Sequence, residues 1–231
     1  MAERISIVVP VYNEAGTVAS VIERLPAIDL PVPREVIVIN DGSRDQTRPV
    51  LDALAPRPEL VIIHNELNRG KGHAVRMGFS RAGGTIVAIQ DADLELDPAQ
   101  LSDLVSPIMK GDTNVVYGSR FLTGANGTPW ASHAANRFLT AVTNTLYGGT
   151  LTDMETCYKV MRTDVAKSLN LTADRFEIEP EITAKLLRHG HAITERPVRF
   201  SPRSRAAGKK IGWKDGVAAI RLLLGYRFSR R

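Results

Sequence analysis

The feature that most constrains the fold is an alternation of short apolar runs with amphipathic segments through the first 120 residues. Residues 5–11 are nearly all apolar, as expected of a strand that is buried on both faces. Apolar side chains then recur at helical spacing over residues 18–25, and Pro26 predicts the end of that helix. Because this order repeats, it predicts right-handed βαβ units and an α/β fold with a mostly parallel sheet. The further strands are predicted over residues 36–39, 60–63 and 86–89, with helical faces over residues 50–54 and 74–82 between them.

The second half of the chain carries a weaker pattern. Residues 201–212 are polar and basic, which predicts a loop. No internal repeat, low-complexity tract or linker interrupts the sequence, so we predict a single domain over residues 1–231. Strands are predicted over residues 115–117, 158–161 and 193–200, and helices over residues 134–146, 179–189 and 214–226.

Composition limits the class of protein. With 231 residues, of which 43% are hydrophobic and 24% are charged, the chain is long enough to bury a sizeable core. The one cysteine, Cys157, excludes an internal disulfide and favours a reducing compartment. No signal peptide precedes the first strand, and no apolar run approaches the ~18 residues that a membrane-spanning helix requires. We therefore expect a cytoplasmic protein.

Charge is distributed unevenly along the chain. Residues 196–231 hold 11 of the 30 basic residues and one acid, Asp215, whereas the preceding residues hold 24 of the 25 acids. A basic end on an acidic body predicts an anionic partner: a phosphate, an anionic membrane surface or a nucleic acid. Few aromatic residues accompany the basic loop, with Trp213 the one nearby, which argues against nucleic acid. The predicted helix over residues 214–226 is amphipathic and basic, so it is expected to lie on an anionic membrane, to dock onto the body or to contact a second copy.

Polar clusters follow three of the predicted strands. Asn13 and Glu14 follow the first strand, residues 40–43 follow the second, and Asp91 and Asp93 follow the fourth. Because ligands bind at the carboxyl ends of the strands in an open parallel sheet, we expect the three clusters to converge at one edge. Each cluster taken singly is also compatible with a helix cap or a turn.

The segment from Asp91 to Asp93 is the sharpest of these signals. Two carboxylates one residue apart at a strand end repel each other unless a cation neutralises them. A hard divalent ion such as Mg²⁺ or Mn²⁺ takes carboxylate oxygens and leaves positions open for phosphate oxygens. We therefore predict a metal site with Asp91 and Asp93 as ligands and Glu95 as a third. A solvated acidic turn is the alternative.

Taken in order, these segments resemble the motifs of family 2 glycosyltransferases with the GT-A fold. The resemblance covers nearly the whole chain and begins with residues 9–14 (VPVYNE), 40–43 (NDGS), 68–72 (NRGKG) and 91–93 (DAD). Residues 118–120 (GSR), 152–159 (TDMETCYK) and 208–211 (GKKI) are similar to the branch of dolichol- or polyprenyl-phosphate mannose and glucose synthases. The resemblance implies an inverting hexosyltransferase that takes a nucleotide sugar, GDP-mannose or UDP-glucose, and a polyprenyl- or dolichyl-phosphate acceptor.

The resemblance also implies roles for individual residues. Residues 1–120 would bind the nucleotide sugar, and residues 121–231 would bind the acceptor. Arg120 matches an arginine near the phosphates of donor and acceptor, and Arg203, Arg205, Lys209 and Lys210 fall in a basic loop that closes over the site. Two features depart from the family pattern: Asn40 stands where many relatives have aspartate, and the apolar C-terminal spans of some relatives are absent. The expected catalytic residues are Asp93, Arg120, Arg203 and Lys209, and the expected donor-binding residues are Pro10, Tyr12, Glu14, Asp41, Lys71 and Asp91.

Transfer to a lipid phosphate needs no strong general base, because the nucleophile is already an anion. The enzyme must instead overcome the repulsion between the acceptor phosphate and the leaving diphosphate, which a metal ion and arginines would do. Two alternatives stay open: transfer to a hydroxyl acceptor in polysaccharide or glycolipid synthesis, with Glu155 or Glu179 as base, and a non-catalytic nucleotide- or nucleic-acid-binding module. The expected partners are the nucleotide sugar, the polyprenyl phosphate and an anionic membrane that the protein touches peripherally. A homodimer or a membrane-protein partner is also left open.

Overall fold

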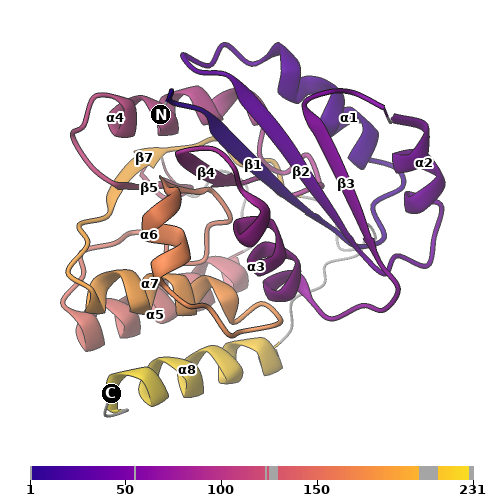
Figure 1. Ribbon diagram of the computed structural model, residues 1–231. Coiled ribbons are helices and arrows are strands. Elements are labelled where there is room, and N and C mark those ends of the chain that lie inside the picture. The colour runs from indigo at the N-terminus through magenta and orange to yellow at the C-terminus, as the bar shows by residue number, and fades with distance from the viewer. Residues whose placement is uncertain (1, 55, 123, 125–129, 203–212, 229–231) are drawn as a thin grey trace.

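A seven-stranded sheet forms the centre of the protein, and helices cover it on both faces (Figure 1). The computed structural model describes residues 2–54, 56–122, 124, 130–202 and 213–228. The strands are β1 (Ile5–Val11), β2 (Arg34–Asp41), β3 (Leu60–Asn65), β4 (Ile86–Ile89), β5 (Val115–Ser119), β6 (Lys159–Arg162) and β7 (Thr194–Pro197). The helices are α1 (Val18–Arg24), α2 (Thr47–Leu54), α3 (Lys71–Arg81), α4 (Leu101–Met109), α5 (Trp130–Tyr147), α6 (Thr163–Ser168), α7 (Ile178–Arg188) and α8 (Trp213–Phe228), with short 3₁₀ turns at Leu25–Ala27 and Pro98–Gln100.

The sheet has the order β3-β2-β1-β4-β6-β5-β7, and its strands are mostly parallel, which confirms the predicted α/β class. Strands β1, β2, β3 and β4 pair in parallel, and β5 pairs in parallel with β7. Strand β6 is antiparallel to both β4 and β5. It follows that β4 and β5 run in the same direction and end at the same edge of the sheet, whereas β6 begins there, at Lys159.

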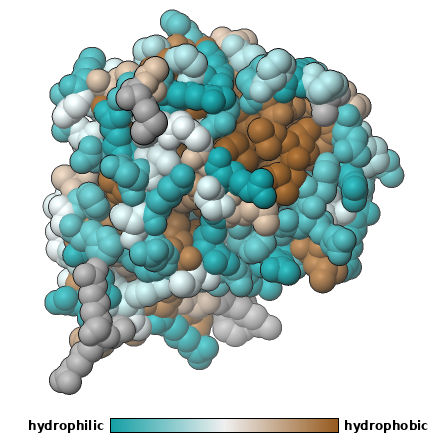
Figure 2. Space-filling model, in the orientation of Figure 1, coloured by the Kyte–Doolittle hydropathy of each residue, from teal (hydrophilic) through white to brown (hydrophobic). Residues whose placement is uncertain are grey.

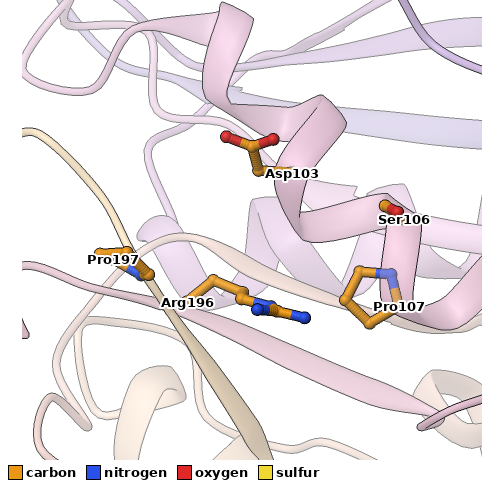
Figure 3. A pocket seen from close by; sticks show the side chains of 5 residues that line it. All are labelled: Asp103, Ser106, Pro107, Arg196 and Pro197. Atoms are coloured by element: carbon orange, nitrogen blue, oxygen red, sulfur yellow. The ribbon is translucent and has the colours of Figure 1, made fainter.

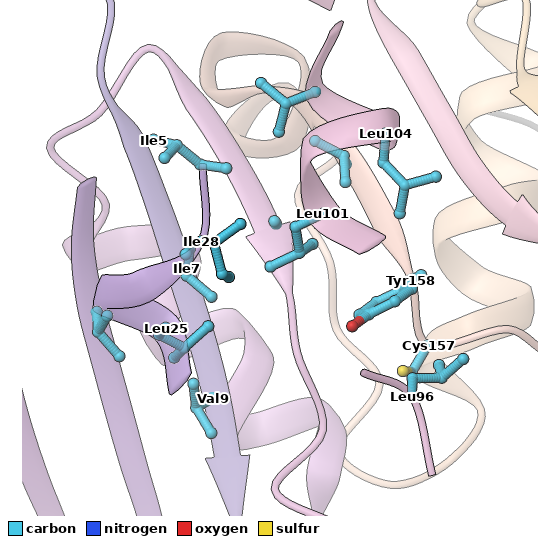
Figure 4. Close-up of a cluster of buried hydrophobic side chains, with 14 of the residues drawn as sticks. Ile5, Ile7, Val9, Leu25, Ile28, Leu96, Leu101, Leu104, Cys157 and Tyr158 are labelled. Carbon is cyan, nitrogen blue, oxygen red and sulfur yellow. The ribbon is translucent and has the colours of Figure 1, made fainter. Parts of the chain in front are cut away.

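Two apolar layers hold the helices to the sheet. Side chains alternate between the faces of a strand, so Ile5, Ile7 and Val9 join one layer and Val8 joins the other. The first layer packs against α1, α2 and α4, and Figure 4 shows its buried side chains between β1 and α4. The second layer packs against α3, α6 and α7. Burial on both faces explains why the first strands read as continuous apolar runs.

Helices α5, α7 and α8 pack on one another beyond the second layer, with α8 farthest from the sheet (Figure 1). The Tyr147 hydroxyl on α5 donates to the backbone oxygen of Leu223 on α8 at 2.5 Å. The Tyr226 hydroxyl on α8 donates to Glu181 on α7 at 2.6 Å. These partly buried polar contacts fix α8 against the body, as one of the sequence-based alternatives for this helix expected.

Some elements differ from the prediction. Helices α4 and α6 were not predicted, although Leu101, Leu104, Val105 and Ile108 recur at helical spacing and are all buried on α4. The strand predicted over residues 193–200 was too long, because β7 ends at Pro197. Helix α5 begins four residues before the predicted start, at Trp130.

One face of the molecule exposes a continuous apolar area. Figure 2 shows apolar side chains gathered over β2 and β3, on the side of the sheet that faces the viewer. Strand β3 is an edge strand of the sheet, and Val61 on it is 42% exposed. Elsewhere on this face hydrophilic side chains predominate.

Candidate active site

The loops that follow β1 and β2 are joined by hydrogen bonds at the carboxyl ends of these strands. The backbone N–H of Asn13 donates to the Ser43 hydroxyl at 2.9 Å, and the backbone N–H of Arg44 donates to the Asn13 side-chain oxygen at 2.8 Å. Asn13 adopts a positive φ of 52°, a conformation that asparagine tolerates better than most residues. The first two polar clusters of the sequence therefore form one continuous structure.

The predicted donor-binding residues of β1 lie at this junction. Pro10 and Tyr12 are half-buried at the end of the strand, and Glu14 is buried. The Thr17 hydroxyl donates to a Glu14 carboxylate oxygen at 2.9 Å, and the Glu14 backbone N–H donates to the Thr47 hydroxyl at 2.8 Å. These contacts fix the segment between β1 and α1.

Asp41, at the end of β2, organises the loop that precedes α3. Its carboxylate accepts hydrogen bonds from the backbone N–H of Arg69 at 3.1 Å and of Gly70 at 2.7 Å, and from the Asn65 side chain at 3.1 Å. Gly70 has φ of 113° and lies so close to the next segment that an added Cβ would be 2.3 Å from the backbone oxygen of Asp174. Asp41 therefore holds the loop that presents the first residue of α3.

That first residue is Lys71, whose ammonium group lies between two carboxylates. Its Nζ is 2.9 Å from Asp91 Oδ1 and 3.0 Å from Glu179 Oε1. The Lys159 Nζ, at the start of β6, is 2.5 Å from the other oxygen of Glu179. The lysine-carboxylate cluster formed by Lys71, Lys159, Asp91 and Glu179 thus joins α3, β6, the end of β4 and the first turn of α7.

Burial makes the charges of this cluster interdependent. Burial acts to lower the pKa of Lys71, but the carboxylates of Asp91 and Glu179 outweigh it and raise that pKa well above its ordinary value. Burial likewise acts to raise the pKa of Glu179, yet the ammonium groups of Lys159 and Lys71 hold it below its ordinary value. Lys71 and Glu179 therefore both keep their charges near neutral pH.

The predicted metal ligands lie in the segment after β4. Asp91 is 28% exposed, Asp93 and Glu95 are half-buried, and Asp93 accepts a hydrogen bond from the Glu95 backbone N–H at 3.2 Å. In the described residues, no three His, Cys, Asp or Glu side chains are grouped so that they could hold a metal ion by themselves. Mg²⁺ is usually held by one or two carboxylates together with substrate phosphates, so an accessible carboxylate at a strand end suits such an ion.

Arg120, directly after β5, is held rigidly. Its guanidinium donates to both carboxylate oxygens of buried Asp153, each at 2.7 Å. The Phe121 and Phe200 rings flank it, with their centroids 5.5 Å and 5.3 Å from the guanidinium carbon. Asp153 is itself positioned by a hydrogen bond of 3.0 Å from its backbone N–H to Glu195. Burial acts to lower the pKa of Arg120, but Asp153 outweighs it and raises that pKa, so the guanidinium stays charged.

Glu155 is strained electrostatically. Its Oε1 atom is buried and has no hydrogen-bond partner. Burial, with a further contribution from Glu179, raises the pKa of Glu155 from 4.5 to about 7, although the cationic groups of Lys159 and Arg120 act in the opposite direction. A carboxyl that titrates near neutral pH at such a position can exchange a proton under physiological conditions.

Two groups of residues fall outside this arrangement. The hollow shown in Figure 3 lies between α4 and β7, and its lining residues include none of the predicted site residues. The predicted loop residues Arg203, Arg205, Lys209 and Lys210 lie outside the described residues.

Sequence reasoning did not find the pairing of Lys71 with Glu179 and Asp91, nor the support of Asp153 by Glu195. Lys71 and Glu179 are 108 positions apart in the sequence. Lys71 is the first residue of α3, and Glu179 lies in the first turn of α7. No local pattern reports such a contact. The one sequence feature that could have pointed to the cluster is that Lys159 and Glu179 are charged residues within segments predicted as a strand and a helix.

Comparison with known proteins identifies the protein family. Residues 6–169 match the domain described as glycosyl transferase family 2, and this match covers more than half of the chain. The chain therefore belongs to glycosyl transferase family 2.

Three named proteins are similar in sequence to this chain. The chain is 28% identical over 99% of its length to the low-salt glycan biosynthesis hexosyltransferase Agl6 of Haloferax volcanii, and spans 56% of that protein. It is 25% identical over 91% of its length to the polyprenol monophosphomannose synthase of Mycolicibacterium smegmatis, and spans 82% of it. It is 39% identical over 47% of its length to an undecaprenyl-phosphate 4-deoxy-4-formamido-L-arabinose transferase of Yersinia enterocolitica, and spans 35% of it. Two of these three relatives are named for a polyprenol monophosphate or an undecaprenyl phosphate, and the chain spans little more than half of the first and about a third of the third.

Solved structures confirm the fold. Glucosyl-3-phosphoglycerate synthase from Mycobacterium tuberculosis, crystallised with Mn²⁺, UDP and phosphoglyceric acid, matches with a TM-score of 0.75. The two chains are 21% identical, and the match covers 99% of this chain and 80% of the synthase. The chain thus has the GT-A fold.

Proposed function

We propose that the protein is an inverting hexosyltransferase that moves a sugar from a nucleotide sugar to a polyprenyl phosphate. The observation that carries the proposal is the location of Asp91 and Arg120. Arg120 directly follows β5, Asp91 lies two residues after the end of β4, and these two strands end at the same edge of the sheet. An accessible carboxylate for a metal ion and a fixed guanidinium for a phosphate suit a reaction between two phosphate-bearing substrates. Relatives named for transfer to polyprenol or undecaprenyl phosphate support this choice of acceptor.

On the donor side, residues 1–120 would bind the nucleotide sugar. Asp91 and Asp93 would hold Mg²⁺ or Mn²⁺, with Glu95 nearby, and the ion would neutralise charge on the leaving diphosphate. Crystals of the structural neighbour contain Mn²⁺ or Mg²⁺ with UDP, which supports a divalent ion. Pro10, Tyr12, Glu14 and Asp41 are the proposed residues around the nucleotide, with Lys71 beside Asp91.

On the acceptor side, Arg120 would bind the acceptor phosphate. Asp153 already occupies one edge of its guanidinium, so the phosphate would use the N–H groups that remain. Fixing the cation in advance lowers the cost of ordering it during binding. Arg203 and Lys209 are proposed to complete the phosphate contacts from the basic loop.

Helices α5 and α8 would bring the protein to the membrane surface. Large apolar side chains are exposed on them: Trp130 at 84% and Phe138 at 58% on α5, and Phe228 at 75% on α8. No acidic residue occurs in α5 or in the described side chains of α8, which carry Arg221 and Arg227. Exposed aromatic and basic side chains are typical of peripheral binding to anionic lipids. None of the helices in the described part of the chain is long and apolar enough to cross a bilayer.

A second candidate function is transfer to a hydroxyl acceptor. The observation that favours it is Glu155, because a carboxyl whose pKa is about 7 is well matched to a general base near neutral pH. In that case Glu155→Gln would abolish transfer. For a phosphate acceptor, which needs no base, the same variant would retain most of its activity.

The test is a transfer assay with purified protein, Mn²⁺, polyprenyl phosphate and radiolabelled GDP-mannose or UDP-glucose. We expect label in the organic phase for the wild type, its loss in Asp93→Ala, and its retention in the control Asp112→Ala, which removes an exposed carboxylate. Equal label in Asp93→Ala and wild type would refute the metal-dependent mechanism. Absence of label with every nucleotide sugar, combined with transfer to a hydroxyl acceptor, would favour the second candidate.

A further inference from the structure

Lys71 forms an ion pair with the carboxylate of Asp91, which is proposed to bind the metal ion. Its Nζ contacts both oxygens of Asp91, at 2.9 Å and 3.1 Å. The Lys71 side chain is only 15% exposed, so this contact is partly shielded from water. Asp91 is therefore already neutralised before any ion arrives.

Glu179 gives Lys71 a second partner that stays in place. It is buried on α7, with its side chain 5% exposed, and its other oxygen is bound by Lys159, which is itself fully buried. The Lys159 ammonium also donates to the backbone oxygens of Met154 and Thr156. Glu179 is thus fixed, and Lys71 would still have Glu179 as a counter-ion if it left Asp91.

The charge balance of the lysine-carboxylate cluster determines what can bind there. Two ammonium groups and two carboxylates leave the cluster formally neutral, so a divalent ion held by Asp91 and Asp93 would add net positive charge next to Lys71. At the low effective dielectric of a partly buried site this repulsion is strong. A nucleoside diphosphate bound with the ion supplies negative charge and removes the repulsion.

We infer that Lys71 is a positioning residue that couples metal binding to donor binding. Without donor, Lys71 neutralises Asp91 and opposes the metal ion. With donor and ion bound, Lys71 would release Asp91 to the ion and interact with the diphosphate, while Glu179 would keep the lysine in place. The inference rests on the proposed use of a nucleotide sugar and a divalent ion. It adds that the ion binds tightly only together with the donor.

The experiment measures Mn²⁺ affinity from the electron paramagnetic resonance signal of free Mn²⁺, with and without UDP or GDP. Coupling between two ligands at equilibrium is reciprocal and commonly about 5–150-fold. We expect wild type to bind Mn²⁺ at least ~10-fold more tightly when the matching nucleoside diphosphate is present. Lys71→Met should bind Mn²⁺ alone ~10-fold more tightly than wild type, so that its coupling falls by about that factor and keeps only the part that comes from direct contact between the ion and the diphosphate.

Glu179→Gln should change the affinity in the opposite direction. With its second partner neutral, Lys71 is left to Asp91, so Mn²⁺ alone should bind more weakly than to wild type. A general loss of structure would weaken Mn²⁺ binding in both Lys71→Met and Glu179→Gln, whereas the proposed charge effect changes the affinity in opposite directions. Lys71→Arg keeps the positive charge and should keep the coupling.

Lys185→Met is the matched control. Lys185 is 13% exposed and pairs with Glu181 at 2.8 Å on the same helix, away from Asp91. It should leave Mn²⁺ affinity and coupling unchanged. Coupling in Lys71→Met equal to that of wild type would overturn this inference alone. Failure of wild type to bind Mn²⁺ with either diphosphate would overturn the proposed function together with it.

Discussion

Replacing Glu155 by glutamine should stabilise the protein above neutral pH. The Glu155 carboxyl has a buried oxygen without a hydrogen-bond partner, and burial raises its pKa from 4.5 to about 7. Between these two values the folded chain binds the proton more tightly than the unfolded chain does. The free energy of unfolding therefore falls as the pH rises through this range. Glutamine has nearly the same shape and cannot ionise, so it removes this cost.

The magnitude follows from the size of the change. One pKa unit corresponds to about 1.4 kcal/mol, so ionised Glu155 destabilises the fold by about 3 kcal/mol at pH 8. The cost disappears below pH 4.5, where the carboxyl is protonated in both states. Glu155→Gln should thus exceed wild type by up to about 3 kcal/mol at pH 8 and by much less at pH 5.

The assay is urea denaturation of both proteins at pH 5, 6, 7 and 8, with the difference in unfolding free energy plotted against pH. Other titrating groups cancel in this difference. Glu66→Gln, which replaces an exposed carboxylate, serves as the control and should give a flat line. A difference between Glu155→Gln and wild type that does not grow from pH 5 to pH 8 would refute the reasoning.

Three further perturbations test other parts of the site. Asp153→Asn leaves the buried Arg120 guanidinium without its counter-ion and should cost about 3–5 kcal/mol of stability in urea denaturation; a loss below ~1 kcal/mol would show that the pair is solvated. Gly70→Ala adds a Cβ that would meet a backbone oxygen at 2.3 Å, and it forces alanine to a φ of 113°. It should lower the thermal midpoint and raise the KM for the nucleotide sugar, and an unchanged midpoint would contradict the geometry. Trp130→Ser combined with Phe138→Ser should reduce sedimentation with anionic liposomes at least ~5-fold without changing the circular dichroism spectrum; unchanged sedimentation would exclude α5 as the contact.

Much of the fold could be read from the sequence because its signals are local. The run at Ile5–Val11 and the helical spacing after it depend only on which face of each element is buried. The same holds for the position of Asp91 and Asp93 at a strand end, since it follows from the end of β4 at Ile89. The antiparallel direction of β6 left no such signal, because its four residues KVMR are compatible with either direction.

The contacts that give the site its electrostatic character were decided by the tertiary structure. Lys71 meets Glu179, and Arg120 meets Asp153, because strands from both halves of the chain join one sheet and end at one edge. Charge pairing acts over a few ångströms in space and has no periodicity along the chain, so the sequence specified which charged residues exist but not which of them neutralise one another. The raised pKa of Glu155 likewise depends on burial between segments that are distant in the sequence, which only the folded chain establishes.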